Sequence, residues 1–160
     1  MKDLQRAKIR PFTGQGTGYD AEQWLIALDR CFAMQDFNSN VKARYAITHL
    51  KMFAATWWQI EEKKLHVDMS TITWELFLEN FRDHFLPEQW HQQRADEFHS
   101  LRQYTMSVAE YERKFYELMP YAGFSDSSPL MVQHFIRRLN NRYIGGVKVF
   151  QPKTLKDAMQ

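Results

Sequence analysis

Apolar residues recur every three or four positions along most of the chain, and this spacing predicts amphipathic α-helices. The first helix is expected to start at Asp20, because its side chain can cap the helix with Gln23 as the return partner. No stretch of any length alternates apolar and polar residues as a half-buried strand does. The pattern therefore predicts an all-α protein with about eight helices.

The clearest helical signal is a run of apolar residues, most of them aromatic, in the middle of the chain. Its apolar face comprises Trp74, Phe77, Leu78, Phe81 and Phe85. The helix before this run contains the adjacent residues Trp57 and Trp58. Neighbouring helical positions diverge by about 100°, so the two rings cannot share one narrow face. We expect one ring in the core and the other between lobes or against a partner, which makes both residues interface candidates.

Pro87 is the best internal boundary in the sequence. It disfavours helix at Leu86 and suits the first turn of a helix that starts near Glu88. The expected organisation is a flexible N-terminal segment over residues 1–19, followed by helical lobes over 20–86 and 87–160. Within the second lobe, Ser107 and Glu110 have the spacing of a capping box.

The composition indicates a globular helical protein. Hydrophobic residues make up 44% of the 160 residues and aromatic residues 15%, which is enough for a core. The 21 basic residues nearly balance the 19 acidic ones, so no dominant surface for nucleic acid is indicated. The single cysteine, Cys31, excludes an internal disulfide and is expected to be a small buried hydrophobe. No apolar run has membrane-spanning length and the N-terminus lacks a signal-peptide core, so an intracellular location is expected.

Short motifs that can mark a catalytic or binding site lack the context that such sites require. The glycines between Gly14 and Gly18 follow no buried strand and precede no Gly-Lys-Ser/Thr, so a flexible linker is favoured over a phosphate loop. The six histidines form no His-Glu-x-x-His motif, although His84, His91 and His99 can fall on related faces of neighbouring helices. We assign no catalytic, cofactor-binding or metal-binding residue, and we expect no enzymatic activity and no cofactor.

The densest basic cluster comprises Arg137, Arg138 and Arg142, with Tyr143 beside it. Arginines at the end of a helix suit the helix dipole and a protein interface, and phosphate contact is the alternative. Arginines and aromatic residues are over-represented at interface hot spots. These four residues therefore join the tryptophan pair as candidate interface residues.

Several blocks of residues occur in a recognisable order. They are Phe12-Thr13-Gly14, Ala21-Glu22-Gln23-Trp24-Leu25, Ala54-Ala55-Thr56-Trp57-Trp58, Thr73-Trp74-Glu75-Leu76-Phe77 and Leu101-Arg102-Gln103, with Glu110-Tyr111 and Phe115 behind them. In this order and with these gaps, the sequence from Phe12 onward resembles the capsid region of Gag from gypsy-type LTR retrotransposons.

The resemblance implies a two-lobed, retroviral-capsid-like helical bundle, with an N-terminal lobe over 20–86 and a C-terminal lobe over 87–160. Gln103, Glu110 and Phe115 fall where retroviral capsids carry the major homology region, which organises the C-terminal lobe. Tyr104 stands where many relatives have glycine.

The resemblance also implies a structural protein that self-assembles into a virus-like particle shell around retrotransposon RNA in the cytoplasm. Its partner is then the chain itself. RNA is contacted only indirectly, through a nucleocapsid region absent from this sequence, and no membrane is involved. The alternative is a domesticated Gag-derived adaptor that binds peptides in an apolar groove. A helical nucleic-acid binder is a third hypothesis.

Overall fold

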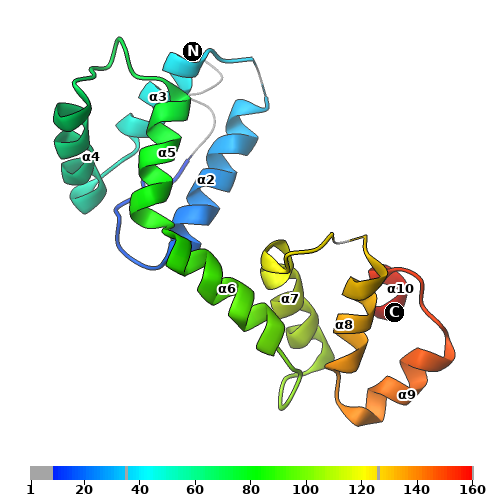
Figure 1. The fold of residues 1–160 in the computed structure, drawn as a ribbon. Coiled ribbons are helices and arrows are strands. Elements are labelled where there is room, and N and C mark those ends of the chain that lie inside the picture. Colours follow the sequence, from blue (N-terminus) through cyan, green and yellow to red (C-terminus); the bar gives the residue numbers. More distant parts are fainter. Residues whose placement is uncertain (1–8, 35, 126, 160) are drawn as a thin grey trace. The chain divides into compact units, whose positions relative to one another are not determined.

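The computed structural model describes residues 9–34, 36–125 and 127–159. The regular structure of these residues is entirely helical, which confirms the all-α prediction (Figure 1). The described α-helices and one short 3-10 helix, η1, are α2 (Gly18–Phe32), α3 (Ser39–Thr48), α4 (Met52–Leu65), α5 (Trp74–Phe85), α6 (Glu88–Ser100), α7 (Val108–Leu118), η1 (Met119–Tyr121), α8 (Pro129–Arg137), α9 (Asn141–Val149) and α10 (Leu155–Met159).

The chain divides into two compact units, one ending at Glu88 and the other beginning at Gln89. Helix α5 ends at Phe85 and α6 begins at Glu88, so Pro87 lies in the interruption between them. Leu86 has φ −132° and ψ 53°, outside the helical region, as the ring of a following proline favours. The assignment of the two units to capsid lobes stays a prediction.

The core of the N-terminal unit is built largely from aromatic rings. Phe77 and Phe81 of α5 are fully buried. The ring centroids of Trp24 on α2 and Phe81 are 5.2 Å apart. Those of Trp74 and Phe32 are 5.1 Å apart, with the two rings edge to face. The aromatic face predicted for α5 is therefore the face that α5 turns to the core.

The segment before α2, which the sequence predicts to be flexible, packs against this core over residues 9–17. The Phe12 N–H donates to the His49 carbonyl at 2.9 Å, and the Phe12 carbonyl accepts from the Lys51 N–H at 2.9 Å. The Phe12 ring is buried among rings of α2 and α5, 5.2 Å from that of Trp24. Residues 1–8, the rest of the predicted segment, lie outside the described residues.

Gly14 is part of this packing and does not serve as a linker residue. Its φ of +76° lies in the left-handed region, and a Cβ there would lie 2.7 Å from Cδ1 of Phe53 and 3.1 Å from the backbone nitrogen of Ala54. The linker interpretation failed because the short-range glycine pattern says nothing of the neighbouring helix α4 that the loop touches.

Helix α2 begins at Gly18, two residues before the predicted start. Thr17 is the N-cap, and Asp20 is the third residue of the helix. The Thr17 N–H donates to the Asp20 carboxylate at 2.8 Å. Asp20 is therefore the return partner of the cap, and the predicted pairing of Asp20 with Gln23 is wrong.

The core of the C-terminal unit gathers side chains of α6, α7 and α8, with Ala158 of α10 buried against them. Its fully buried rings are Phe98, Tyr111, Phe115 and Phe135. The Tyr111 hydroxyl donates to the Phe135 carbonyl at 3.0 Å, and burial raises the pKa of this phenol. A buried hydroxyl that is hydrogen-bonded in this way costs little to desolvate and fixes α7 against α8.

Candidate functional site: a buried glutamine loop and the exposed surfaces

The loop over residues 101–107, between α6 and α7, is organised around Gln103, whose side chain is fully buried. Its Nε2 donates to the Met106 carbonyl at 3.0 Å, and its Oε1 accepts from the Asn140 N–H at 2.9 Å. Its backbone N–H donates to the Arg138 carbonyl at 2.9 Å. One buried amide therefore ties this loop to the turn between α8 and α9.

Tyr104 adopts the backbone conformation that glycine favours. Its φ is +44°, in the left-handed region, while its side chain is exposed. Its carbonyl accepts from Nδ2 of Asn140 at 2.9 Å. This second link to Asn140 supports the strained turn, which is thus formed without a glycine at this position.

Ser107 and Glu110 form the predicted capping box at the start of α7. The Ser107 N–H donates to the Glu110 carboxylate at 2.8 Å, and the Glu110 N–H donates to Ser107 Oγ at 3.2 Å. The hydrogen bonds from the Ser107 backbone and hydroxyl lower the pKa of Glu110, because they stabilise its charged form. Phe115, one turn and a half further along α7, lies in the core 5.2 Å from Phe98. The assignment of Gln103, Glu110 and Phe115 to a major homology region stays a prediction.

A histidine stack links α6 to α8. His134 lies on Phe98 with ring centroids 4.4 Å apart and planes 15° apart, and its Nε2 is 3.3 Å from the Phe98 carbonyl oxygen. Arg138 donates to the His99 carbonyl at 2.6 Å. Burial, together with Arg138 and His99 nearby, lowers the pKa of His134 to about 4, so this ring is neutral at pH 7. The rings of His99 and His134 also lie near each other, with centroids 5.9 Å apart. These two histidines were not related from the sequence, because helical spacing cannot relate positions on α6 and α8.

Both tryptophans of the candidate interface pair are buried, Trp57 at 5% exposure and Trp58 at 2%. Trp57 stacks on His84 with ring centroids 5.2 Å apart, and Trp58 packs against Phe77 with ring centroids 5.1 Å apart. The expectation that only one ring belongs to the core is wrong. Trp57 contacts the C-terminal end of α5, and Trp58 contacts Phe77 nearer its N-terminal end, so this one helix covers both rings. Their burial argues against a direct contact of either ring with a partner.

The basic cluster divides into three environments. Arg138 is the partly buried residue that binds the His99 carbonyl, so its role is internal. Arg142 lies over the ring of Tyr143, with 4.8 Å from the guanidinium carbon to the ring centroid, on the exposed side of α9. Arg137 is exposed and lines a groove of the C-terminal unit. The structure thus leaves Arg137, Arg142 and Tyr143 accessible for contact.

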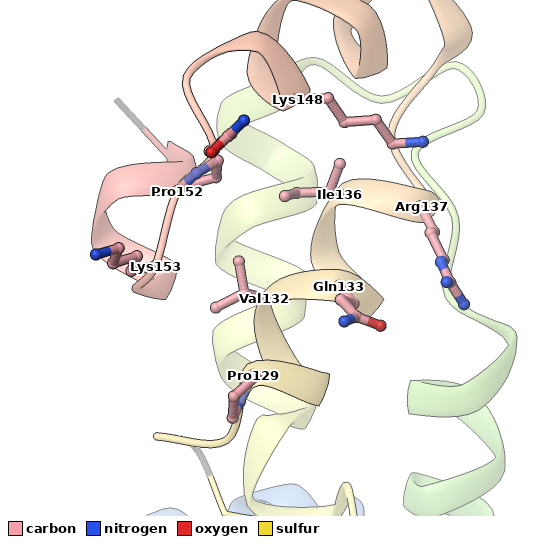
Figure 2. A pocket seen from close by; sticks show the side chains of 9 residues that line it. Pro129, Val132, Gln133, Ile136, Arg137, Lys148, Pro152 and Lys153 are labelled. Atoms are coloured by element: carbon pink, nitrogen blue, oxygen red, sulfur yellow. The ribbon is translucent and has the colours of Figure 1, made fainter.

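The groove lies between α8 and the segment that joins α9 to α10, and Figure 2 shows its lining side chains. Its volume is about 440 Å³, within the usual range of ligand pockets. Of its lining residues, Arg137 alone was singled out from the sequence, because the lining comes from separate helices and a loop.

Helix α4 and the end of α9 are among the places where large apolar side chains remain exposed. On α4, Met52 is 62% exposed and Ile60 50% exposed, and at the end of α9 Val149 is 77% and Phe150 83% exposed. Scattered exposed apolar residues are normal, but apolar side chains that are so strongly exposed to solvent on a helix face or at a helix end are suited to contact with another protein.

Two properties concern only the part of the chain that the structure describes. There, no group of three or more His, Cys, Asp or Glu side chains is placed to hold a metal ion. None of the described helices has the length and apolar character needed to cross a bilayer. Cys31 is buried, as predicted, and burial raises the pKa of its thiol, which disfavours the reactive thiolate.

The buried polar groups described above hold loops and helix ends together within an all-helical fold. The chain belongs to the family described as "Ty3 transposon capsid-like protein", which it matches over residues 2–160. The resemblance to a gypsy-type Gag capsid domain is thereby confirmed. A solved structure described as "dARC1 capsid domain dimer" is 18% identical, with 96% of this chain and 91% of that chain covered and a TM-score of 0.42. No curated protein matches the chain.

Proposed function

We propose that this chain is a Gag capsid protein that self-assembles into the shell of a virus-like particle around retrotransposon RNA. The observation that carries the proposal is the match of residues 2–160 to the Ty3 capsid-like family. In this proposal the particles are cytoplasmic and the partner is a further copy of the chain. RNA is held by a nucleocapsid region outside the present sequence.

The surface properties support weak, repeated contacts between copies. The exposed apolar residues of α4 and of the end of α9 can be covered by another copy without disturbing either core. The formal net charge of +2 is small, so salt can screen the residual repulsion between copies. Each contact can be weak, because many contacts in one shell act together.

The test is sedimentation velocity of the purified chain over a range of protein and salt concentrations, with electron microscopy of the concentrated samples. We expect a monomer or dimer when the chain is dilute and larger assemblies when it is concentrated or salted. An unchanging monomer over the whole range would contradict self-assembly.

A matched pair of variants tests whether α4 contributes. Ile60→Glu and Gln59→Glu both add one negative charge at adjacent exposed positions, but only the first removes an exposed apolar side chain. We expect Ile60→Glu to raise the concentration at which assemblies form, and Gln59→Glu to change it little. Equal effects of the two variants would assign the change to charge and would exclude α4 as an apolar contact.

The alternative is a domesticated adaptor that binds peptides in an apolar groove. The aromatic rings of α2 and α5 leave little free surface for such a peptide. Phe12 of the chain itself covers these rings and is 6% exposed. The adaptor hypothesis therefore requires a different groove. A monomeric chain that forms no particles under any of the conditions above would favour it.

A further inference from the structure

The groove of the C-terminal unit has an aliphatic floor. Val132 and Ile136 stand one turn apart on α8, and Pro152 faces them from the segment after α9 (Figure 2). None of the described residues that line the groove is aromatic. Such a floor accepts aliphatic side chains, and it offers no ring on which a nucleic-acid base can stack.

The edges of the groove are positively charged. Arg137, Lys148 and Lys153 line it, and no Asp or Glu among the described residues does. Among the described residues, none of these three cations takes part in an ion pair. Three cations around one apolar floor create a local positive potential, although the formal net charge of the whole chain is only +2.

The backbone beside the groove is held in an unusual conformation. Gln151, one of the lining residues, has φ +45°, in the left-handed region that a glutamine rarely adopts. Strained residues of this kind cluster at ligand-binding segments, where the surrounding structure fixes them. Pro152 and Lys153, which also line the groove, follow Gln151 directly.

We propose that this groove binds an acidic linear peptide of a partner protein, with aliphatic side chains on Val132 and Ile136 and carboxylates at Arg137, Lys148 and Lys153. Charge complementarity selects this occupant. The chain's own first eight residues carry three Lys or Arg against one Asp, so they are repelled by the groove. The inference does not depend on self-assembly, because the groove lies within one unit of a single chain.

The experiment is fluorescence anisotropy with the full chain at concentrations below self-association. The probe is a fluorescein-labelled ten-residue peptide of alternating leucine and glutamate, and its control replaces every glutamate by glutamine. We expect binding of the glutamate peptide that weakens as salt rises, and at least tenfold weaker binding of the glutamine peptide. Equal binding of the two peptides, or binding of neither, would overturn the proposal.

Charge reversal locates the site. Lys153→Glu should weaken binding about tenfold, whereas Lys156→Glu should change it less than twofold, because Lys156 is exposed on α10 outside the groove. Circular dichroism confirms that both variants fold. Equal effects of the two reversals would place the peptide elsewhere.

Two competitors test the other occupants. Displacement of the peptide by a ten-nucleotide oligouridylate would identify a general polyanion surface, and release of the peptide when the chain is raised to concentrations at which it self-associates would identify a second copy as the occupant. Either result overturns the assignment to an acidic peptide. Retention of the peptide against both competitors supports it.

Discussion

Replacement of Gln103 is the most direct test of how the C-terminal unit is held together. Gln103→Ala removes the hydrogen bonds from Nε2 to the Met106 carbonyl and from the Asn140 N–H to Oε1. Each bond contributes about 1 kcal/mol, and each partner left unsatisfied costs a further 1–3 kcal/mol or so, reduced where water can reach it. We expect the free energy of unfolding to fall by about 3 kcal/mol.

The expected loss is large for a unit of this size. One kcal/mol shifts the melting temperature of a small domain by about 4–8 °C, so the C-terminal unit should melt roughly 12–24 °C lower. Hydrogen exchange read by mass spectrometry should show faster exchange over residues 101–107 and around Asn140, with the N-terminal unit unchanged. Gln133→Ala, at an exposed position of α8, is the control and should change stability by less than about 0.5 kcal/mol.

A third variant separates hydrogen bonding from volume. Gln103→Met keeps the length of the side chain but removes its amide, which leaves the Met106 carbonyl and the Asn140 N–H without their partner, so it should be nearly as destabilising as the alanine variant. If the methionine variant has the same melting temperature as the wild type, the hydrogen bonds contribute little to stability and the reasoning is refuted. Unchanged exchange at Asn140 in the alanine variant would refute it equally.

Three further perturbations concern single positions. Ser107→Ala should lower the free energy of unfolding by about 1 kcal/mol in urea denaturation, and an unchanged midpoint would remove the capping argument. Gly14→Ala should cost about 1–3 kcal/mol through its positive φ and its contact with Phe53, whereas Gly145→Ala, with open space at the Cβ of α9, should be neutral or stabilising in the same assay. The pKa of His134 is about 4 in the folded chain, below the 6.5 of an ordinary histidine, so the unfolded chain takes up the proton first as the pH falls. The free energy of unfolding should therefore decrease by roughly 2 kcal/mol between about pH 7 and pH 4 and then level off, and His134→Gln should abolish this component; an unchanged pH profile in that variant would contradict it.

Helical periodicity predicted the structure best where one face of one helix decides the packing. The ring spacing of α5 placed Phe77 and Phe81 in the core, and the Ser107 capping box is purely local, so both could be derived from neighbouring residues. The sequence pattern was less successful where two nearby residues can both cap the same helix. Thr17 and Asp20 can each cap a helix, and only the geometry of the loop before α2 makes Thr17 the cap.

The candidate site was harder to derive, because its residues meet through long-range contacts. The side chains of Trp57 and Trp58 do diverge by about 100° around α4. Both are nevertheless buried, because different residues of α5 contact each ring. Gln103 was singled out by resemblance alone, since a glutamine in a loop is ordinarily exposed. Its burial follows from partners near residue 140, which no local pattern can identify.

The two proposals respond to salt in opposite directions, and this separates them on one sample. Apolar self-association through α4 or the end of α9 is favoured by salt, because screening removes the residual repulsion of a chain whose formal charge is +2. Binding of an acidic peptide depends on attraction to Arg137, Lys148 and Lys153, so screening weakens it. A salt titration that strengthens assembly while releasing the peptide would therefore assign the apolar surfaces to contact between copies and the basic groove to a partner. If both responses moved together, one surface would serve both, and the groove would have to be regarded as part of the assembly contact.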